Sequence, residues 1–326
     1  MPSMNQTRVK EFILMGFGNL HSFGVVVFIL FLTIFILTIL GNFMLIVLVS
    51  VNTKLQSPMY YFLCHLSATD LVISSNIVPN MLDAILFGEK KMTYVGCITQ
   101  LYFYSGTTFS ECFLLSMMSY DRYLAICNPL RYSSIMDLKL QIFLSLWPWL
   151  LGLTVNLAGV LPVTNFVFCH NNIIDHIYCD IYPLQKLSCS DTSVLELEVF
   201  LFSMPIFIIP CSFIIVTYVY IFRTIMKIPS TTGKHKAFST CSSHLIVVCT
   251  FYGTLIAKYM IPSVGHSLII NKNVSILHTL LTPLFNPIIY SFRNQDIKIA
   301  CRKLFAQLKA MCKNLANCVP KNLNDV

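Results

Sequence analysis

The chain has 326 residues, of which 56% are hydrophobic and 11% are charged. A soluble globular protein carries about 25% charged residues, so this chain has too little charge to cover a water-facing surface, which argues against a soluble enzyme. Its 12 glycines and 14 prolines are ordinary numbers that exclude collagen-like and low-complexity classes. The composition indicates a protein that crosses a membrane several times.

Seven stretches are long and apolar enough for transmembrane helices, each of which needs roughly 20 residues. In chain order they cover residues 23–49, 55–82, 92–120, 140–168, 199–222, 237–257 and 274–292. The sequence therefore predicts an all-α membrane protein with a seven-transmembrane helix bundle. We expect no signal peptide to be removed, and the first span to act as a signal-anchor.

The basic residues predict the orientation of the bundle. With the C-terminus inside, 15 of the 22 Lys and Arg side chains fall on the cytoplasmic side, as the positive-inside rule requires. The chain then divides into an extracellular N-terminal segment (1–22), the bundle with its loops (23–293) and a cytoplasmic tail (294–326). The net charge of +8 thus reflects orientation and gives no reason to expect nucleic acid as a partner.

Two further features follow from this orientation. Asn5 begins an Asn-Gln-Thr triplet and is a predicted glycosylation site, because the N-terminus lies outside. Residues 295–311 place apolar side chains on one helical face and lysines and arginines mostly elsewhere. This pattern favours a short amphipathic helix lying on the inner leaflet against membrane lipid. Cys301 or Cys312 could carry an acyl chain there, or each could be an unmodified thiol.

Four cysteines fall on the predicted outer face, where disulfides form. They are Cys97, Cys169, Cys179 and Cys189. Four cysteines allow three pairings into two disulfides, and their spacing does not choose among them. A zinc site built from two of the loop cysteines with His170 and His176 is the alternative.

Two carboxylates fall inside predicted spans, where a charge is costly and usually functional. Asp70 and Glu111 reach similar depth on neighbouring antiparallel helices, with Asn42 and Asn286 somewhat nearer the inside. Two acids at one level share a cation or a proton rather than both ionising alone. A sodium ion is the candidate metal, and a shared proton is the alternative.

Two short motifs lie near the cytoplasmic ends of spans. Asp121, Arg122 and Tyr123 close the third span, where an arginine can simply extend toward water. Asn286 and Pro287 precede Tyr290 in the seventh span. Proline removes a backbone hydrogen bond and loosens the helix locally, which suits a segment that must move.

Together these motifs resemble the rhodopsin-like G-protein-coupled receptors, and more narrowly the tetrapod-type odorant (olfactory) receptors. The resemblance spans nearly the whole chain. It rests on GN at 41–42, PMYYFL at 58–63, LSATD at 66–70, MSYDRYLAICNPLRY at 118–132, KAFSTCSSHL at 236–245, FYGT at 251–254 and PLFNPIIYSFRN at 283–294. Phe285 and Phe292 replace common leucines. Lys258 stands where an apolar residue is usual, and Ile261 where a base is common.

The resemblance implies pairings that the spacing left open. By analogy with the family, Cys97 pairs with Cys179, and Cys169 pairs with Cys189. The Asp70 and Glu111 pair resembles the family's proposed sodium site.

The resemblance also implies a switch. Arg122 is held by Asp121 in the inactive state and released in the active state, while the inner end of the sixth span swings out. The opened cleft accepts an olfactory-type stimulatory G protein. The residues expected to take part are Asp121, Arg122, Tyr123, Tyr218, His244, Asn286, Pro287 and Tyr290.

The ligand pocket is expected in the outer half of the bundle, between spans three, five, six and seven. Its predicted lining is mostly apolar and aromatic with a few hydroxyls, as is usual for small-ligand sites. The residues are Tyr104, Ser105, Thr108, Phe109, Phe202, Ile206, Phe207, Tyr252, Leu255, Tyr259, Ile276 and Thr279. Lys258 could pair with an acidic or carbonyl odorant at the rim, but we expect it to extend to the outer surface instead.

The expected function is that of an odorant receptor in the plasma membrane, a multi-pass protein that binds small apolar volatiles and raises cyclic AMP through its G protein. It is not expected to be an enzyme, since His65, His244 and His278 lie at different depths and form no ligand set. No cofactor is expected beyond the sodium ion. A receptor for a non-odorant small molecule, or a small secondary transporter that uses Asp70 and Glu111, is the alternative. The transporter lacks support because no inverted repeat is evident.

Overall fold

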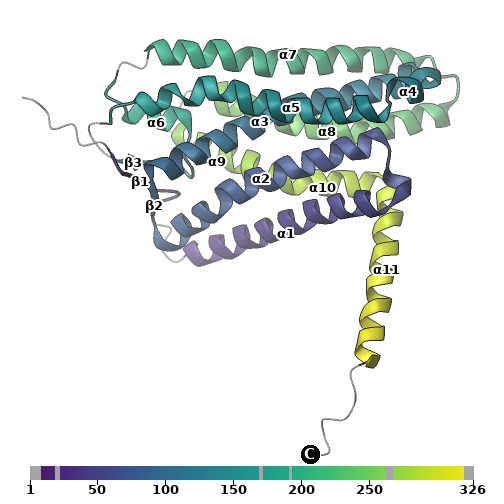
Figure 1. Ribbon diagram of the computed structural model, residues 1–326, viewed down its shortest axis with the longest axis horizontal. Coiled ribbons are helices and arrows are strands. Elements are labelled where there is room, and N and C mark those ends of the chain that lie inside the picture. The colour runs from purple at the N-terminus through teal and green to yellow at the C-terminus, as the bar shows by residue number, and fades with distance from the viewer. Residues whose placement is uncertain (1–8, 19–22, 169–171, 191–192, 261–266, 319–326) are drawn as a thin grey trace, which may run out of the picture.

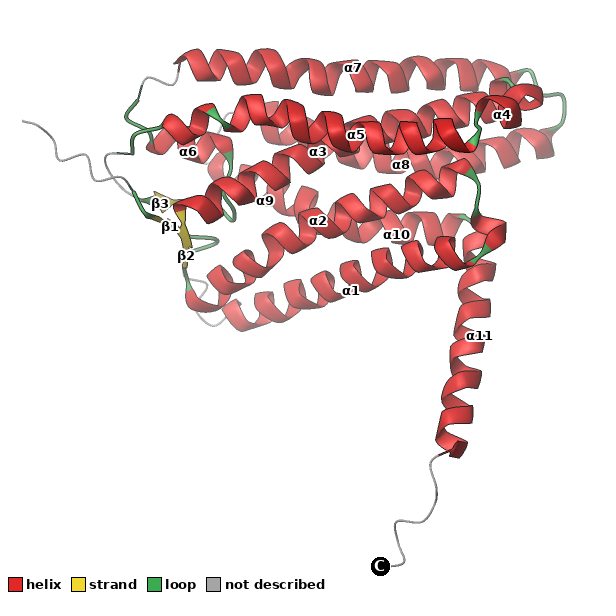
Figure 2. Cartoon of the chain, in the orientation of Figure 1, coloured by secondary structure: helices red, strands yellow, loops and turns green. Residues whose placement is uncertain are grey.

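The computed structural model describes residues 9–18, 23–168, 172–190, 193–260 and 267–318. It is mostly helical, at 84%, and its long helices run side by side (Figures 1 and 2). The long helices of the bundle are α1 (Gly24–Val51), α2 (Pro58–Phe87), α3 (Tyr94–Cys127), α5 (Leu138–Val160), α7 (Ser193–Met226) and α8 (Thr231–Met260). A further long helix, α11 (Gln295–Cys318), lies outside the bundle and extends beyond the amphipathic helix predicted over residues 295–311. The shorter ones are α4 (Pro129–Ile135), α6 (Ile181–Leu187), α9 (Ser267–Ile276) and α10 (Thr282–Arg293).

Local chemistry sets several helix ends. Pro58 occupies the first turn of α2, and Gly88, with φ of 80°, follows its last residue in a left-handed conformation, as helix ends often require. The Oγ1 atom of Thr93 accepts a hydrogen bond from the Gly96 amide and caps α3. Asp137 caps α5 in the same way, through the Leu140 amide at 2.8 Å.

Five helical segments of the described chain are long and apolar enough to cross a membrane. They are Gly24–Val51, Pro58–Phe87, Leu138–Asn165, Leu201–Met226 and Thr231–Tyr259. The third predicted span corresponds to α3, which is long enough but buries many polar side chains, among them Thr107, Ser110 and Glu111. The last corresponds to α9, a π-helical stretch (Leu277–Leu281) and α10 in succession.

The structure corrects several boundaries, among them the start of the second span, whose helix begins at Pro58 and not at Leu55. The predicted span 92–120 starts too early, because Met92 and Thr93 belong to a strand and the helix begins at Tyr94. The predicted span 140–168 ends too late. Its helix stops at Val160, just before a 3-10 turn over Pro162–Asn165, since the ring of Pro162 leaves no backbone N–H to continue the ladder.

A small sheet at one end of the bundle was not predicted. β1 (Glu11–Leu14) pairs antiparallel with β2 (Lys90–Thr93) and parallel with β3 (Ile173–Ile174). Phe12 and Leu14 are fully buried beneath the long loop between α5 and α7. The N-terminal segment is therefore anchored to that loop. α11 leaves the bundle at the opposite end, where it points away from the long helices (Figure 1).

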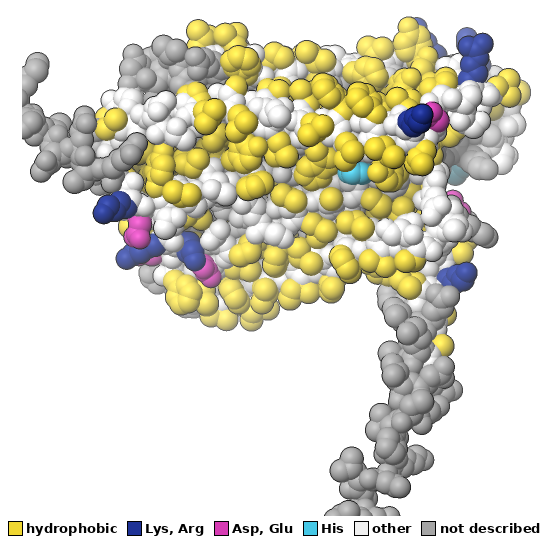
Figure 3. Space-filling model, in the orientation of Figure 1, with side chains coloured by type: hydrophobic (Ala, Val, Ile, Leu, Met, Phe, Trp, Pro, Cys, Tyr) yellow, Lys and Arg dark blue, Asp and Glu magenta, His cyan; other side chains and the backbone are white. Residues whose placement is uncertain are grey.

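The surface matches a membrane protein. On the face in Figure 3, hydrophobic side chains cover the middle of the bundle, and charged side chains gather toward the two ends. Large apolar residues such as Leu30, Ile208 and Ile256 are more than half exposed. Such a belt suits lipid acyl chains because its side chains are apolar. The helices behind it satisfy their own backbone hydrogen bonds, as a bilayer requires.

Candidate functional site

A disulfide bonds the long loop between α5 and α7 to the N-terminal end of α3. Cys97 and Cys179 are bonded, with 5.4 Å between their Cα atoms, which confirms that predicted pairing. The Cys179 amide also donates a hydrogen bond to the side-chain oxygen of Gln100 at 2.9 Å. Because Cys179 is oxidised, it cannot be a thiolate ligand, and the zinc alternative is wrong. Cys189 takes part in a disulfide, but its predicted partner Cys169 lies outside the described residues, as does the glycosylation site at Asn5.

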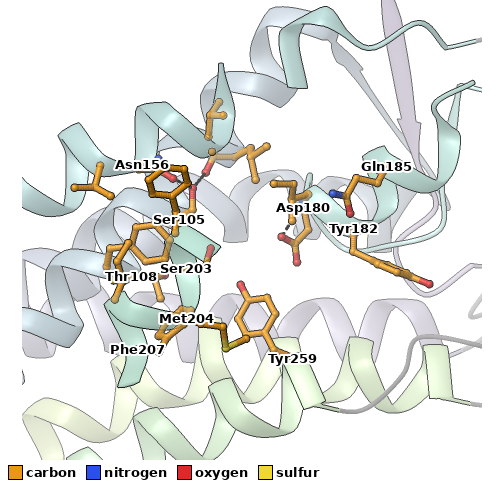
Figure 4. A pocket seen from close by; sticks show the side chains of 18 residues that line it. Ser105, Thr108, Asn156, Asp180, Tyr182, Gln185, Ser203, Met204, Phe207 and Tyr259 are labelled. Carbon is orange, nitrogen blue, oxygen red and sulfur yellow. Dashed lines mark hydrogen bonds between the residues drawn. The ribbon is translucent and has the colours of Figure 1, made fainter. Parts of the chain in front are cut away.

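A cavity of about 250 Å³ lies directly below this anchored loop. Figure 4 shows its lining side chains, which come from α3, α5, α7, α8 and the loop with α6. Of the predicted pocket residues, those that line it are Ser105, Thr108, Phe109, Phe202, Ile206, Phe207 and Tyr259.

A second cavity of about 200 Å³ lies between α7 and α8 and shares Phe207 and Tyr259 with the first. Tyr252 and Leu255, also predicted, line this second space. Tyr104, Ile276 and Thr279 are not among the described lining residues of either cavity. Tyr104 and Thr279 are buried in helix packing instead.

Several lining residues were missed by sequence reasoning. Asn156 comes from α5, which was not expected to contribute, and Asp180 and Gln185 come from the loop. A signal was present for two of them. Asn156 is a polar residue in a span without charges, and Asp180 directly follows the disulfide cysteine Cys179.

Lys258 lies near the C-terminal end of α8 and is buried, with 3% of its surface exposed. The expectation that it extends to the outer surface is therefore wrong. Its Nζ atom lies 2.7 Å from Oδ2 of Asp180 and donates to the hydroxyls of Tyr104 at 2.9 Å and Tyr178 at 2.7 Å. It also lies 4.7 Å from the centre of the Tyr104 ring, a distance typical of cation–π contacts.

Two loop residues at this ion pair, Asp180 and His176, have shifted pKa values. Burial opposes ionisation of Asp180, yet the nearby charges of Lys258 and His176 and the hydrogen bonds from Lys258 and the Ile181 amide hold its pKa below the usual range. Burial lowers the pKa of His176 to about 4. At neutral pH the pair is thus ionised, and the neighbouring imidazole is neutral.

The two internal carboxylates are both buried. Asp70 accepts hydrogen bonds from the Asn286 amide on both oxygens, at 3.1 and 3.0 Å. Oε1 of Glu111, Oδ1 of Asn42 and Oγ of Ser74 have no hydrogen-bond partner among the described residues. The described chain holds no group of three or more His, Cys, Asp or Glu side chains suited to a metal.

At the other end of the bundle, the Arg122 guanidinium binds Oδ2 of Asp121 at 3.0 and 2.5 Å. The Tyr132 hydroxyl donates to the other oxygen of Asp121 at 2.7 Å. Tyr218 lies 2.8 Å from Nδ1 of His244, and Nε2 of His244 lies 3.1 Å from the Leu115 carbonyl.

The remaining predicted switch residues lie on α3 and α10. The Tyr290 hydroxyl is buried and has no partner among the described residues. Pro287 in α10 packs against Gly41 of α1, where a Cβ atom would come within 3.3 Å of the proline ring. Tyr123 packs against Ile221 and Ile225 on α7.

Comparison with known proteins gives one consistent result. A family model described as olfactory receptor matches residues 31–308. The chain is 43% identical to olfactory receptor 10A7 of Homo sapiens, over 93% of this chain and 96% of that protein. It is 42% identical to olfactory receptor 1468 of Rattus norvegicus (95% and 98% covered). It is 40% identical to olfactory receptor 5G9 of Mus musculus (96% and 100% covered).

Proposed function

Because the chain belongs to the olfactory receptor family, we propose that it is an odorant receptor that binds a small, mostly apolar volatile molecule in the outer half of the bundle. The observation that carries this proposal is the cavity under the loop, which the Cys97–Cys179 disulfide anchors to α3. Its lining combines aromatic and aliphatic side chains with a few polar groups, as small-molecule sites usually do.

The proposed topology has seven spans in the plasma membrane. They are α1, α2, α3, α5, α7, α8 and the continuous stretch α9–α10. The N-terminal segment (1–22) lies outside, the bundle covers 23–293 and the tail (294–326) lies inside. The excess of Lys and Arg on the α4 and α11 side supports this orientation. We place α11 on the inner leaflet, with its basic side chains near anionic lipid.

Signalling follows from a shift between two states. An odorant that binds the active conformation better increases its population. The hydrogen bonds between Arg122 and Asp121 are those expected of the inactive state. In the active state Arg122 turns toward Tyr218 and Tyr290 as the inner end of α8 moves out, and the opened cleft binds an olfactory-type stimulatory G protein, which raises cyclic AMP.

We further propose that Asp70 and Glu111 hold a sodium ion. The residues present fit a hard cation, which prefers oxygen ligands, because Oε1 of Glu111, Oδ1 of Asn42 and Oγ of Ser74 lack partners in the described chain. A bound cation would offset the charge of the two carboxylates. Glu111→Gln should abolish a sodium-dependent rise in the melting temperature of the purified receptor, measured against choline. Equal sodium effects in both proteins would contradict the site.

The test of receptor function is cyclic-AMP production in cells that express the chain together with an olfactory-type G protein. A broad odorant panel is applied to the wild type and to Arg122→Ala, and surface expression is measured for both. A dose-dependent response that Arg122→Ala abolishes at equal surface expression is expected. Silence of a surface-expressed wild type across the panel would contradict the odorant assignment.

A further inference from the structure

Among the described residues that line the cavity, one side chain is charged, and its position indicates which polar group a ligand needs. The Asp180 carboxylate points into the space enclosed by Ser105, Phe207 and Tyr259 (Figure 4). Its residue is only 5% exposed, so any polar group of a ligand that reaches it is shielded from water.

The hydrogen bonds of Lys258 are already complete. A lysine ammonium has three N–H donors, and three acceptors lie within hydrogen-bond distance: Oδ2 of Asp180 and the hydroxyls of Tyr104 and Tyr178. Lys258 is also not among the described residues that line the cavity. It therefore has no donor left for an acidic or carbonyl ligand.

Asp180, by contrast, has acceptor capacity left. A carboxylate offers about four lone-pair sites. One is used by Lys258 on Oδ2 and one by the Ile181 amide on Oδ1, at 2.9 Å. The side that faces the cavity can accept a hydrogen bond from a ligand, while the charge stays compensated by Lys258.

A second polar group complements this acceptor. Gln185 lines the same cavity, and its Nε2 atom is buried without a hydrogen-bond partner among the described residues. A buried donor left unpaired is costly, and natural proteins usually satisfy it. In Figure 4 the Gln185 amide lies beside Asp180, on the same side of the cavity.

From this arrangement, and resting on the proposed function, we infer that the receptor selects neutral ligands that carry a hydroxyl group on an apolar body. The hydroxyl hydrogen is donated to Asp180, and the hydroxyl oxygen accepts from Gln185. An ether can only accept, an ammonium ion meets the nearby charge of Lys258, and a carboxylate meets the charge of Asp180. An alcohol or phenol satisfies both protein groups without adding charge.

The test compares ligands that differ only in the polar group. Octanol, octyl methyl ether, octylamine and octanoate are added to the purified full-length receptor, and binding is measured by thermal shift. Phenethyl alcohol and its methyl ether provide a second skeleton. Cyclic-AMP responses of expressing cells are recorded in parallel. We expect the alcohol of at least one skeleton to bind about tenfold more tightly than its ether, because only the alcohol donates a hydrogen bond to the charged carboxylate.

Two variants identify the groups responsible. The double variant Asp180→Leu/Lys258→Met removes both charges together, which buried ion pairs often tolerate, and should bind alcohol and ether with equal affinity. Lys258→Met alone leaves Asp180 uncompensated, so octylamine should bind about tenfold more tightly than to the wild type. Asp175→Asn is the matched control, because this aspartate lies in the same loop, pairs with Lys272 and is exposed. It should keep the wild-type preference.

The outcomes separate the inference from the proposed function. An alcohol preference in binding without a cyclic-AMP response supports the inference and contradicts the coupling. Equal affinity of the wild type for alcohol and ether, or no binding of either alcohol, overturns the inference even if another odorant activates the receptor. An alcohol preference that persists in the double variant overturns the role of Asp180.

Discussion

At the scale of single residues, the outer half of the molecule contains a buried ion pair between Lys258 and Asp180. A buried ion pair is not in itself evidence of stability, because desolvation offsets much of the attraction. Such a pair stabilises the fold only when its remaining donors and acceptors are also hydrogen-bonded. Lys258 and Asp180 meet this condition, since each has further hydrogen-bond partners. This pair joins the loop to α8 and supplies the one carboxylate among the described residues that line the cavity.

His176 makes stability depend on pH. Its pKa is about 4 in the folded protein and about 6.5 in an unfolded chain. Between these two pH values the imidazole binds a proton in the unfolded state but not in the folded state. The contribution of neutral His176 to the free energy of unfolding is therefore fully present above about pH 6.5. It falls by about 3 kcal/mol as the pH drops to 4. Melting temperatures of the purified receptor between pH 4 and 7 should show this loss.

Two variants distinguish His176 from the rest of the protein, and the charged groups that face it include Asp180, Lys258 and Lys272. His176→Asn should have a smaller pH slope than the wild type, because the titrating imidazole is gone. His235→Asn, at an exposed histidine of α8, should keep the wild-type slope. Identical slopes in all three proteins would show that His176 does not titrate as its burial requires.

At the scale of elements, close approach of α3 and α5 shapes one wall of the cavity. At Gly152 a Cβ atom would lie 2.3 Å from Oγ of Ser110, 2.6 Å from its amide nitrogen and 2.8 Å from the Gly106 carbonyl oxygen. The two backbones can touch there only because glycine has no side chain. This contact sets the distance between Asn156 and the α3 residues that line the cavity.

Gly152→Ala should therefore destabilise the receptor by about 1–3 kcal/mol or more, since an overpacked contact against backbone cannot relax cheaply. Gly159→Ala is the matched control on the same helix, because an added Cβ atom there meets nothing within 4 Å. Thermal denaturation in detergent compares the two. Equal melting temperatures of both variants would mean that α3 and α5 are not in backbone contact at Gly152.

At the scale of the whole molecule, the Cys97–Cys179 disulfide connects positions 82 residues apart in sequence. It holds β3 and the loop on the end of the bundle and so keeps Asp180 over the cavity. Replacing both cysteines by serine should cost about 2–4 kcal/mol of stability and weaken odorant binding, as measured by thermal shift. Cys249→Ser, at an exposed free cysteine, should change neither property.

The family and the long helices could be predicted from the sequence, whereas the sheet could not. The resemblance identified the olfactory receptor family, and the relatives and family model confirm it. The apolar blocks also located the long helices, because hydrophobic length is written directly in the sequence. The sheet was not predicted, because β1 is four residues long and pairs with strands that are distant in sequence.

The candidate site was predictable where helix periodicity applies. Ser105, Thr108 and Phe109 follow from the facing side of α3, and they line the cavity. Tyr104 is the adjacent residue, and a rotation of one helical position turns it toward Lys258 and Tyr178 instead. Periodicity gives the relative spacing of side chains on a helix but not the angle at which each helix meets its neighbours.

By itself, then, the sequence determined the class of the molecule, its long helices, its family and the Cys97–Cys179 pairing that the family implies. Only the tertiary structure decided that Lys258 is buried and that Asp180 and Gln185 line the cavity. The physical reason is that a lysine near a helix end can reach water or a partner with similar ease. Which of the two it does depends on where a loop far along the chain places a carboxylate.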